Sequence, residues 1–298
     1  MCDRCPVHAG FVVVHSVAGG TGSGLGSAIT EQLRADYPAA FLLSVAVLPF
    51  GSGESPLQHY NLVLCLAALH ATSDCVMTFC NDDVLAVLQR RHGKAALNPN
   101  SGPGVAQRQP CVSMHDINSH IAASVLGALL PTSPGCLQCV NLWDTCSALV
   151  AMPQWKFTTC TTNSAHSSVN RQRPPPAAAD VVGRVARTLA RHVGNSQEDR
   201  EFVPVYSVAT QITARGAASR DMDAVSRSVA AILNHVPWNP FPIDTRLCTC
   251  KMSPERCMLW SVAVTASIEC LWACFPMVSL AFIGSTSTLC GSLIAVLM

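Results

Sequence analysis

A run of glycine, threonine and serine near the start of the chain has the residue types and spacing of a phosphate-binding loop. The run consists of Gly19, Gly20, Thr21, Gly22, Ser23 and Gly24. Glycines allow backbone N–H groups to close on an anion, and the positive end of a following helix attracts it. An apolar segment, residues 11–17, precedes the run and an amphipathic segment follows it. The pattern predicts a nucleotide site between a strand and a helix that Ser23 caps.

Residues missing around this loop exclude the common nucleotide and hydrolase sites. A P-loop needs Gly-Lys-Ser/Thr, but no lysine lies near the run. A dinucleotide site needs an acidic residue after the next strand, whereas the apolar segment 41–48 ends in Pro49-Phe50. The first acid beyond it is Glu54, in a second glycine-containing loop. Gly-x-Ser-x-Gly, the nucleophile motif of serine hydrolases, is absent from the chain.

Apolar segments alternate with helical ones from residue 11 to residue 93. Strands are expected at 11–17, 41–48 and 75–80, and helices after the glycine run, at 57–71, and from Asp82 or Asp83 to Gly93. Such alternation predicts an α/β fold, with a parallel sheet covered on both faces and ligands beyond the carboxyl ends of its strands. The three loops should therefore meet at one edge.

The segment from Ala18 to Gly24 resembles the glycine signature of the tubulin superfamily, which usually has a third leading glycine where this chain has Ala18. His15-Ser16, Tyr60-Asn61 and Asp116-Ile117-Asn118 follow in tubulin-like order and spacing. Residues 49–54 and 58–61 are more similar to the delta branch than to alpha or beta chains. The resemblance is dense over residues 10–157, thinner over 203–233 and lost beyond 267.

This resemblance implies a Rossmann-like, mostly parallel sheet, which would be part of the tubulin nucleotide-binding domain, and a second, smaller α/β intermediate domain. The expected division is 1–157 for the partial GTP-binding domain and core helix, 158–180 for a polar linker, 181–266 for the intermediate domain, and 267–298 for an apolar tail of uncertain origin. Within 181–266 we expect a helix over 181–193, a strand over 202–212 and a helix over 226–235. The resemblance implies that central strands of the sheet are missing, so open sheet edges and exposed apolar faces are expected.

The resemblance also implies a ligand and its contacts. GTP phosphates would lie against Gly20, Thr21, Gly22 and Ser23, within the run 19–24. Glu54 would contact the ribose and Asn118 the guanine. A second guanine position, usually Asn, is held by Asp82, with Asn81 one residue earlier; a carboxylate could accept hydrogen bonds from guanine N1 and N2, while a plain helix cap is an equal alternative. Mg²⁺ is implied, with ligands outside this chain.

Asp144 aligns with the carboxylate that, in tubulins, reaches the nucleotide of the next subunit. By resemblance, the protein would be a slow GTPase whose hydrolysis is completed at contacts with other tubulin subunits. It would be cytoplasmic and cytoskeletal, associated with microtubules of centrioles or basal bodies. Two alternatives stay open: Asp144 is an exposed structural residue, and the chain is a nucleotide-free relative or truncated gene product in which the glycine run is only a turn.

Composition limits the remaining possibilities. The net charge of +1 and the lack of a basic run argue against nucleic acid as a partner. Residues 271–298 carry no charge, but Pro276, Gly284 and Gly291 interrupt them, so a membrane span is not the favoured interpretation. Cysteine pairs such as Cys2-x-x-Cys5 lie too far from one another for a metal site, and the histidines, including His15 and His70, are interpreted as structural.

Overall fold

A computed structural model describes most of the first half of the chain and shorter parts of the second. The described residues are 10–52, 57–96, 112–129, 142–165, 206–215, 222–248 and 258–266. The expected helix over 181–193 and the apolar tail 267–298 lie outside them. No helix among the described residues is long and apolar enough to cross a bilayer.

Four parallel strands form the first half of the sheet. They are β1 (Gly10–Ser16), β2 (Phe41–Leu48), β3 (Cys75–Cys80) and β4 (Phe157–Ala165). Each pairs in parallel with the next, in the order of the sequence. Residues 42–46 of β2 are all buried, as a strand covered on both faces requires. The predicted parallel α/β sheet is confirmed.

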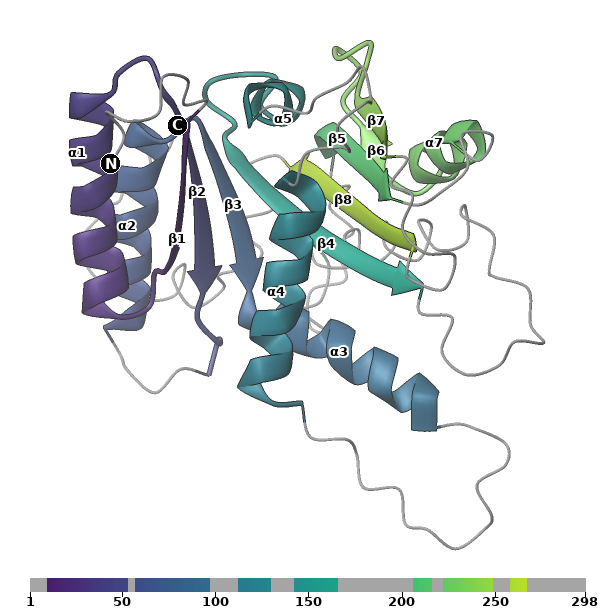
Figure 1. Ribbon diagram of the computed structural model, residues 1–298, viewed down its shortest axis with the longest axis horizontal. Helices are drawn as coiled ribbons and strands as arrows, with labels where there is room; N and C mark the ends of the chain where they lie inside the picture. Colours follow the sequence, from purple (N-terminus) through teal and green to yellow (C-terminus); the bar gives the residue numbers. More distant parts are fainter. Residues whose placement is uncertain are drawn as a thin grey trace, which may run out of the picture.

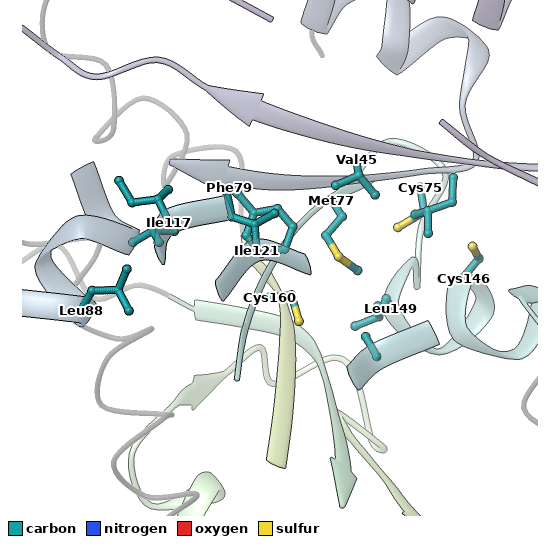
Figure 2. Close-up of a cluster of buried hydrophobic side chains, with 13 residues drawn as sticks. Val45, Cys75, Met77, Phe79, Leu88, Ile117, Ile121, Cys146, Leu149 and Cys160 are labelled. Carbon is teal, nitrogen blue, oxygen red and sulfur yellow. The ribbon is translucent and has the colours of Figure 1, made fainter. Parts of the chain in front are cut away.

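Helices cover both faces of these strands (Figure 1). One face carries α1 (Gly26–Asp36) and α2 (Gln58–Thr72); the other carries α3 (Asn81–Ala96), α4 (Met114–Leu129) and α5 (Leu142–Leu149). Alternate residues of β3 divide between the faces: Val76 packs with α2, and Met77 packs in the cluster on the opposite face (Figure 2). The core therefore consists of two apolar layers separated by the sheet.

The remaining strands extend the same sheet. Strand β8 (Met258–Ala266) lies antiparallel between β4 and β5 (Tyr206–Arg215). On its other side β5 pairs in parallel with β6 (Asn234–His235) and β7 (Ile243–Cys248), and α7 (Met222–Ala230) lies beside them. Strand β1 is at the opposite end of the strand order. The division of the chain into two domains stays a prediction.

The structure corrects several expected boundaries. Residues 158–165, expected in a linker, belong to β4, because its threonines are β-branched and Thr158 and Thr162 are buried in the sheet. Helix α3 begins at Asn81 and continues through Gly93 to Ala96, since an isolated glycine weakens a helix without ending it. The helix expected over 226–235 is instead α7, which buries Val225 and Val229 four residues apart and ends at Ala230.

Candidate nucleotide site

The loops that the sequence singles out leave the carboxyl ends of neighbouring parallel strands. Strand β1 ends at Ser16, β2 at Leu48 and β3 at Cys80. Figure 1 shows the arrowheads of β2 and β3 at the same edge of the sheet, where α3 begins. We call this the carboxyl edge, and the opposite one the amino edge. The glycine run, residues 49–52 and the first turn of α3 share the carboxyl edge, as the sequence predicts.

The glycine run forms the first turns of a helix rather than a loop ahead of it. A π-helical turn, Thr21–Leu25, begins at Gly20 and continues directly into α1. The first backbone bond runs from the Ser23 N–H to the Gly19 carbonyl, at 3.0 Å. The amides of Gly20, Thr21 and Gly22 come before that bond, so they have no carbonyl one turn back to which they can donate. These three N–H groups are the donors that the helix offers to an anion.

Ser23 has a different position from the expected one. It was expected to cap the helix, but it lies inside the first turn, where its buried hydroxyl donates to the Gly19 carbonyl at 2.8 Å. Its amide donates to the same carbonyl. Both donors of Ser23 therefore act within the loop, because the helix begins three residues earlier than the apolar periodicity indicated.

The glycines of the run divide into two groups. A Cβ on Gly22 would overlap the carbonyl oxygen of Ser16, and one on Gly26 would lie 2.7 Å from Nδ1 of His15. These two glycines let the helix pack directly on the end of β1. Among the residues that the structure describes, no atom other than chain neighbours and the backbone of the same helix lies within 4 Å of a Cβ added at Gly19, Gly20 or Gly24. The fold does not need glycine at these three positions, which face open space.

Two side chains that sequence reasoning did not place in the site hold the loop. Nδ1 of His15 is 2.8 Å from the carbonyl oxygen of Gly22, and Nδ2 of Asn61 donates to the Ala18 carbonyl at 3.0 Å. His15 lies on β1 and Asn61 on α2. A sequence motif gives no sign of the contact between Asn61 and Ala18, because 43 residues separate them.

Asp82, in the first turn of α3, contacts the loop that follows β2. Its carboxylate accepts a hydrogen bond from the Gly51 N–H at 2.7 Å, and Gln58 fixes the same loop by donating to the Phe50 carbonyl at 3.1 Å. Asp82 lies within the first turn of α3 and not at its cap. Glu54 lies outside the described residues.

Asn81 and Cys80 complete the end of β3. The Oδ1 atom of Asn81 is buried and has no hydrogen-bond donor among the residues that the structure describes. An amide oxygen in this state can accept a donor from a ligand. Burial, together with the charge of Asp83, raises the pKa of the Cys80 thiol to about 11, so this thiol is neutral at physiological pH.

Comparison with known proteins agrees with this geometry. Residues 1–89 match the Tubulin/FtsZ family, GTPase domain. The chain is 36% identical to the tubulin delta chain of Mus musculus over 89 residues. This aligned region covers 30% of this chain and 20% of the relative. It is 44% identical over 91 residues to the tubulin gamma chain of Saccharomyces cerevisiae, covering 30% and 18%, and 42% identical over 84 residues to the tubulin alpha-1 chain of Pelvetia fastigiata, covering 28% and 18%. The chain thus spans about a fifth of the length of the curated relatives it matches.

The Tubulin/FtsZ match contains the glycine run and the start of α3, and it ends before Asn118 and Asp144. Asn118 is exposed, in the second turn of α4. The start of that helix is fixed by reciprocal bonds: the Ser113 N–H donates to the Asp116 carboxylate at 2.9 Å, and the Asp116 N–H donates to the Ser113 hydroxyl at 3.2 Å. Helix α4 packs against α3, so Asn118 projects from an element that adjoins the GTPase-domain segment.

Asp144 lies at the amino edge, where the parallel strands begin. It is in α5, whose Cys146 and Leu149 pack beside Cys75, the first residue of β3, whereas Leu88 and Ile117 lie near Phe79 at the opposite end (Figure 2). A hydrogen bond with Cys75 and burial raise the pKa of the Cys146 thiol, consistent with this close contact. Because β3 spans about 17 Å from its first to its last residue, Asp144 cannot reach the glycine run of its own chain.

Proposed function

We propose that the chain is a tubulin-family subunit that binds GTP at the carboxyl edge. The phosphates would contact the amides of Gly20, Thr21 and Gly22, and Gly19 and Gly24 would leave the space open for them. The observation that carries the proposal is the first turn of a helix with three donor amides, packed on the end of a parallel strand in the segment that matches the Tubulin/FtsZ GTPase domain. Mg²⁺ would accompany the nucleotide.

Guanine would be read by Asn81, Asp82 and Asn118. The buried, unpartnered Oδ1 of Asn81 is an acceptor suited to the N1–H or the N2 amino group of guanine, and adenine offers no donor at the N1 position. Asp82 uses one oxygen to hold Gly51, which leaves its second oxygen for the base. Glu54 would reach the ribose.

Hydrolysis, in this proposal, needs two subunits. Asp144 and the glycine run lie at opposite edges of the sheet, so the carboxylate could approach only the GTP of a neighbouring copy or of another tubulin. An acid placed there could orient or deprotonate the attacking water. The similarity to the tubulin delta chain supports association with centrioles or basal bodies.

Binding can be tested by titrating the full chain with a fluorescent GTP analogue and then competing with GTP or ATP. We expect GTP to compete at least tenfold better, about 1.4 kcal/mol. Equal competition by ATP would remove guanine recognition from the proposal. No binding of either nucleotide would favour the alternative, a nucleotide-free relative in which the glycine run has only a structural role.

The two-subunit mechanism can be tested by complementation. Gly20→Ala should bind GTP at least tenfold more weakly while keeping Asp144. Asp144→Ala should bind GTP with unchanged affinity but lose turnover. Mixing the two variants should restore hydrolysis, because one supplies the nucleotide site and the other the carboxylate. Ser147→Ala, an exposed change on the same helix, is the matched control and should behave as the unmodified chain. Turnover by Asp144→Ala alone at the unmodified rate would contradict the mechanism.

A further inference from the structure

His15 contacts both the glycine run and the first residue of α1. Its Nδ1 is 2.8 Å from the Gly22 carbonyl oxygen, and its ring is the surface on which Gly26 packs. A carbonyl oxygen can only accept, so Nδ1 carries the proton and donates. The other ring nitrogen, Nε2, is buried and has no hydrogen-bond partner among the described residues. The contact with Gly22 is therefore the polar contact that orients this ring.

The π-helical turn redirects the amide that would serve the Gly22 carbonyl in an α-helix. In an α-helix the Gly26 N–H would donate to the Gly22 carbonyl, four residues earlier. Here the Gly26 N–H instead donates to the carbonyls of Thr21 and Ser23. The wider turn thus takes from the Gly22 carbonyl its usual helical donor, and His15 supplies another. A π-turn inserted at the start of a helix is a feature often found at functional sites.

We propose that His15 is a positioning residue of the nucleotide site: its Nδ1–H donates to the Gly22 carbonyl, holds the π-turn open and so directs the amides of residues 20–22 toward the phosphates. This inference rests on the proposed function for its consequence, whereas the π-turn and the His15 contact are direct observations. The sequence analysis interpreted His15 as structural, and the contact with Gly22 gives it a defined structural role.

Three substitutions separate the donor from the ring. His15→Phe keeps a ring against Gly26 and removes the donor. His15→Asn is smaller, but its side-chain amide can occupy the place of Nδ1 and donate to Gly22. His15→Gln extends its amide to the place of Nε2 and misses Gly22. If the donor matters, Asn should rescue and Phe and Gln should not; if only ring volume matters, Phe should be the best of the three.

Two measurements on the full chain decide the proposal. The first is amide hydrogen exchange of a peptide covering residues 20–27 without nucleotide; exchange should accelerate in the Phe and Gln variants and stay near the original rate in the Asn variant. The second is GTP affinity, which should fall about fivefold or more in Phe and Gln, the factor that one ordinary hydrogen bond corresponds to, and less than twofold in Asn.

The outcomes also distinguish this proposal from the proposed function. Unchanged exchange in His15→Phe, or equal losses in the Phe and Asn variants, would overturn the role of His15. If the unmodified chain binds no GTP, the proposed function fails, while the exchange measurement still decides whether His15 holds the turn. Urea unfolding of each variant shows whether a change in exchange is confined to the loop; a loss of global stability that accounts for all of it would also overturn the proposal.

Discussion

Replacing Gly22 and Gly20 by alanine in separate variants tests whether the glycine run serves the fold or a ligand. The two positions are two residues apart in the same turn and receive the same added methyl group. At Gly22 the methyl would overlap the Ser16 carbonyl oxygen, which belongs to the backbone of β1 and cannot swing aside. At Gly20 the methyl meets open space, and the backbone is already helical, with φ −59° and ψ −39°.

These contacts give expected free energies of unfolding. Inserting a methyl group into a filled space usually costs about 1–3 kcal/mol, and the rigid neighbour of Gly22 places that variant toward about 3 kcal/mol. Alanine at Gly20 should change stability little, or increase it by up to about 1 kcal/mol, because the unfolded chain loses freedom. The two variants should therefore differ by about 2 kcal/mol or more in urea unfolding followed by circular dichroism.

For GTP affinity, Gly20→Ala is the informative variant, because its stability is expected to change little. The Gly20→Ala protein is expected to fold normally yet bind GTP at least tenfold more weakly, about 1.4 kcal/mol, because the methyl group occupies the space in front of the donor amides. Unfolding of Gly22→Ala at the original urea concentration would show that the loop is not seated on β1. Undiminished GTP binding by Gly20→Ala would show that these amides do not hold the phosphates.

Two further predictions concern the end of β3. Asp82→Ala should weaken GTP binding at least tenfold because Gly51 loses its acceptor. Asp82→Asn keeps an oxygen for Gly51, so its GTP affinity should fall less. Equal losses of affinity in the two titrations would show that this contact is irrelevant. Cys80, with a pKa of about 11 instead of 9.0, should react with iodoacetamide roughly a hundredfold more slowly than in urea, as judged by mass spectrometry of its peptide. Because the unfolded thiol ionises first, this group should also lower folding stability as the pH rises from about 9 to about 11, and Cys80→Ser should flatten that fall.

Much of the fold could be predicted because its strands are continuous apolar runs. The bounds expected for β2 and β3, 41–48 and 75–80, agree with the structure, since both strands are buried on two faces and leave a simple pattern. Strand β4 was missed because it is rich in threonine, a polar residue that nonetheless suits a strand. A threonine hydroxyl can find an acceptor inside the sheet: that of Thr158 donates to the Val76 carbonyl at 3.4 Å. The position of β8, antiparallel between β4 and β5, depends on contacts across about a hundred residues, which no local pattern records.

The candidate site could be predicted in its location but not in its internal support. Composition and order identified the glycine run and placed it after a strand, because a loop at a strand end leaves a local signal. The contacts that support the site leave no local signal. Asn61 donates to Ala18, which is 43 residues away, and Asp82 accepts from Gly51, which is 31 residues away. Likewise, nothing in the run itself shows that Gly22 packs on Ser16 while Gly20 faces open space. Only the three-dimensional arrangement separates glycines needed by the fold from those available to a ligand.

The positions of Asp144 and the glycine run also restrict how copies of the chain could work together. Each chain presents the glycine run at one edge of its sheet and α5, which carries Asp144, at the other. A two-fold dimer that joined carboxyl edges would place two glycine runs together and leave both carboxylates remote. A head-to-tail contact, in which different surfaces of the two subunits meet, can bring Asp144 to the next GTP, and such contacts propagate into filaments when rotation does not close them. The proposed chemistry therefore requires contact between subunits, and hydrolysis per subunit should rise with protein concentration.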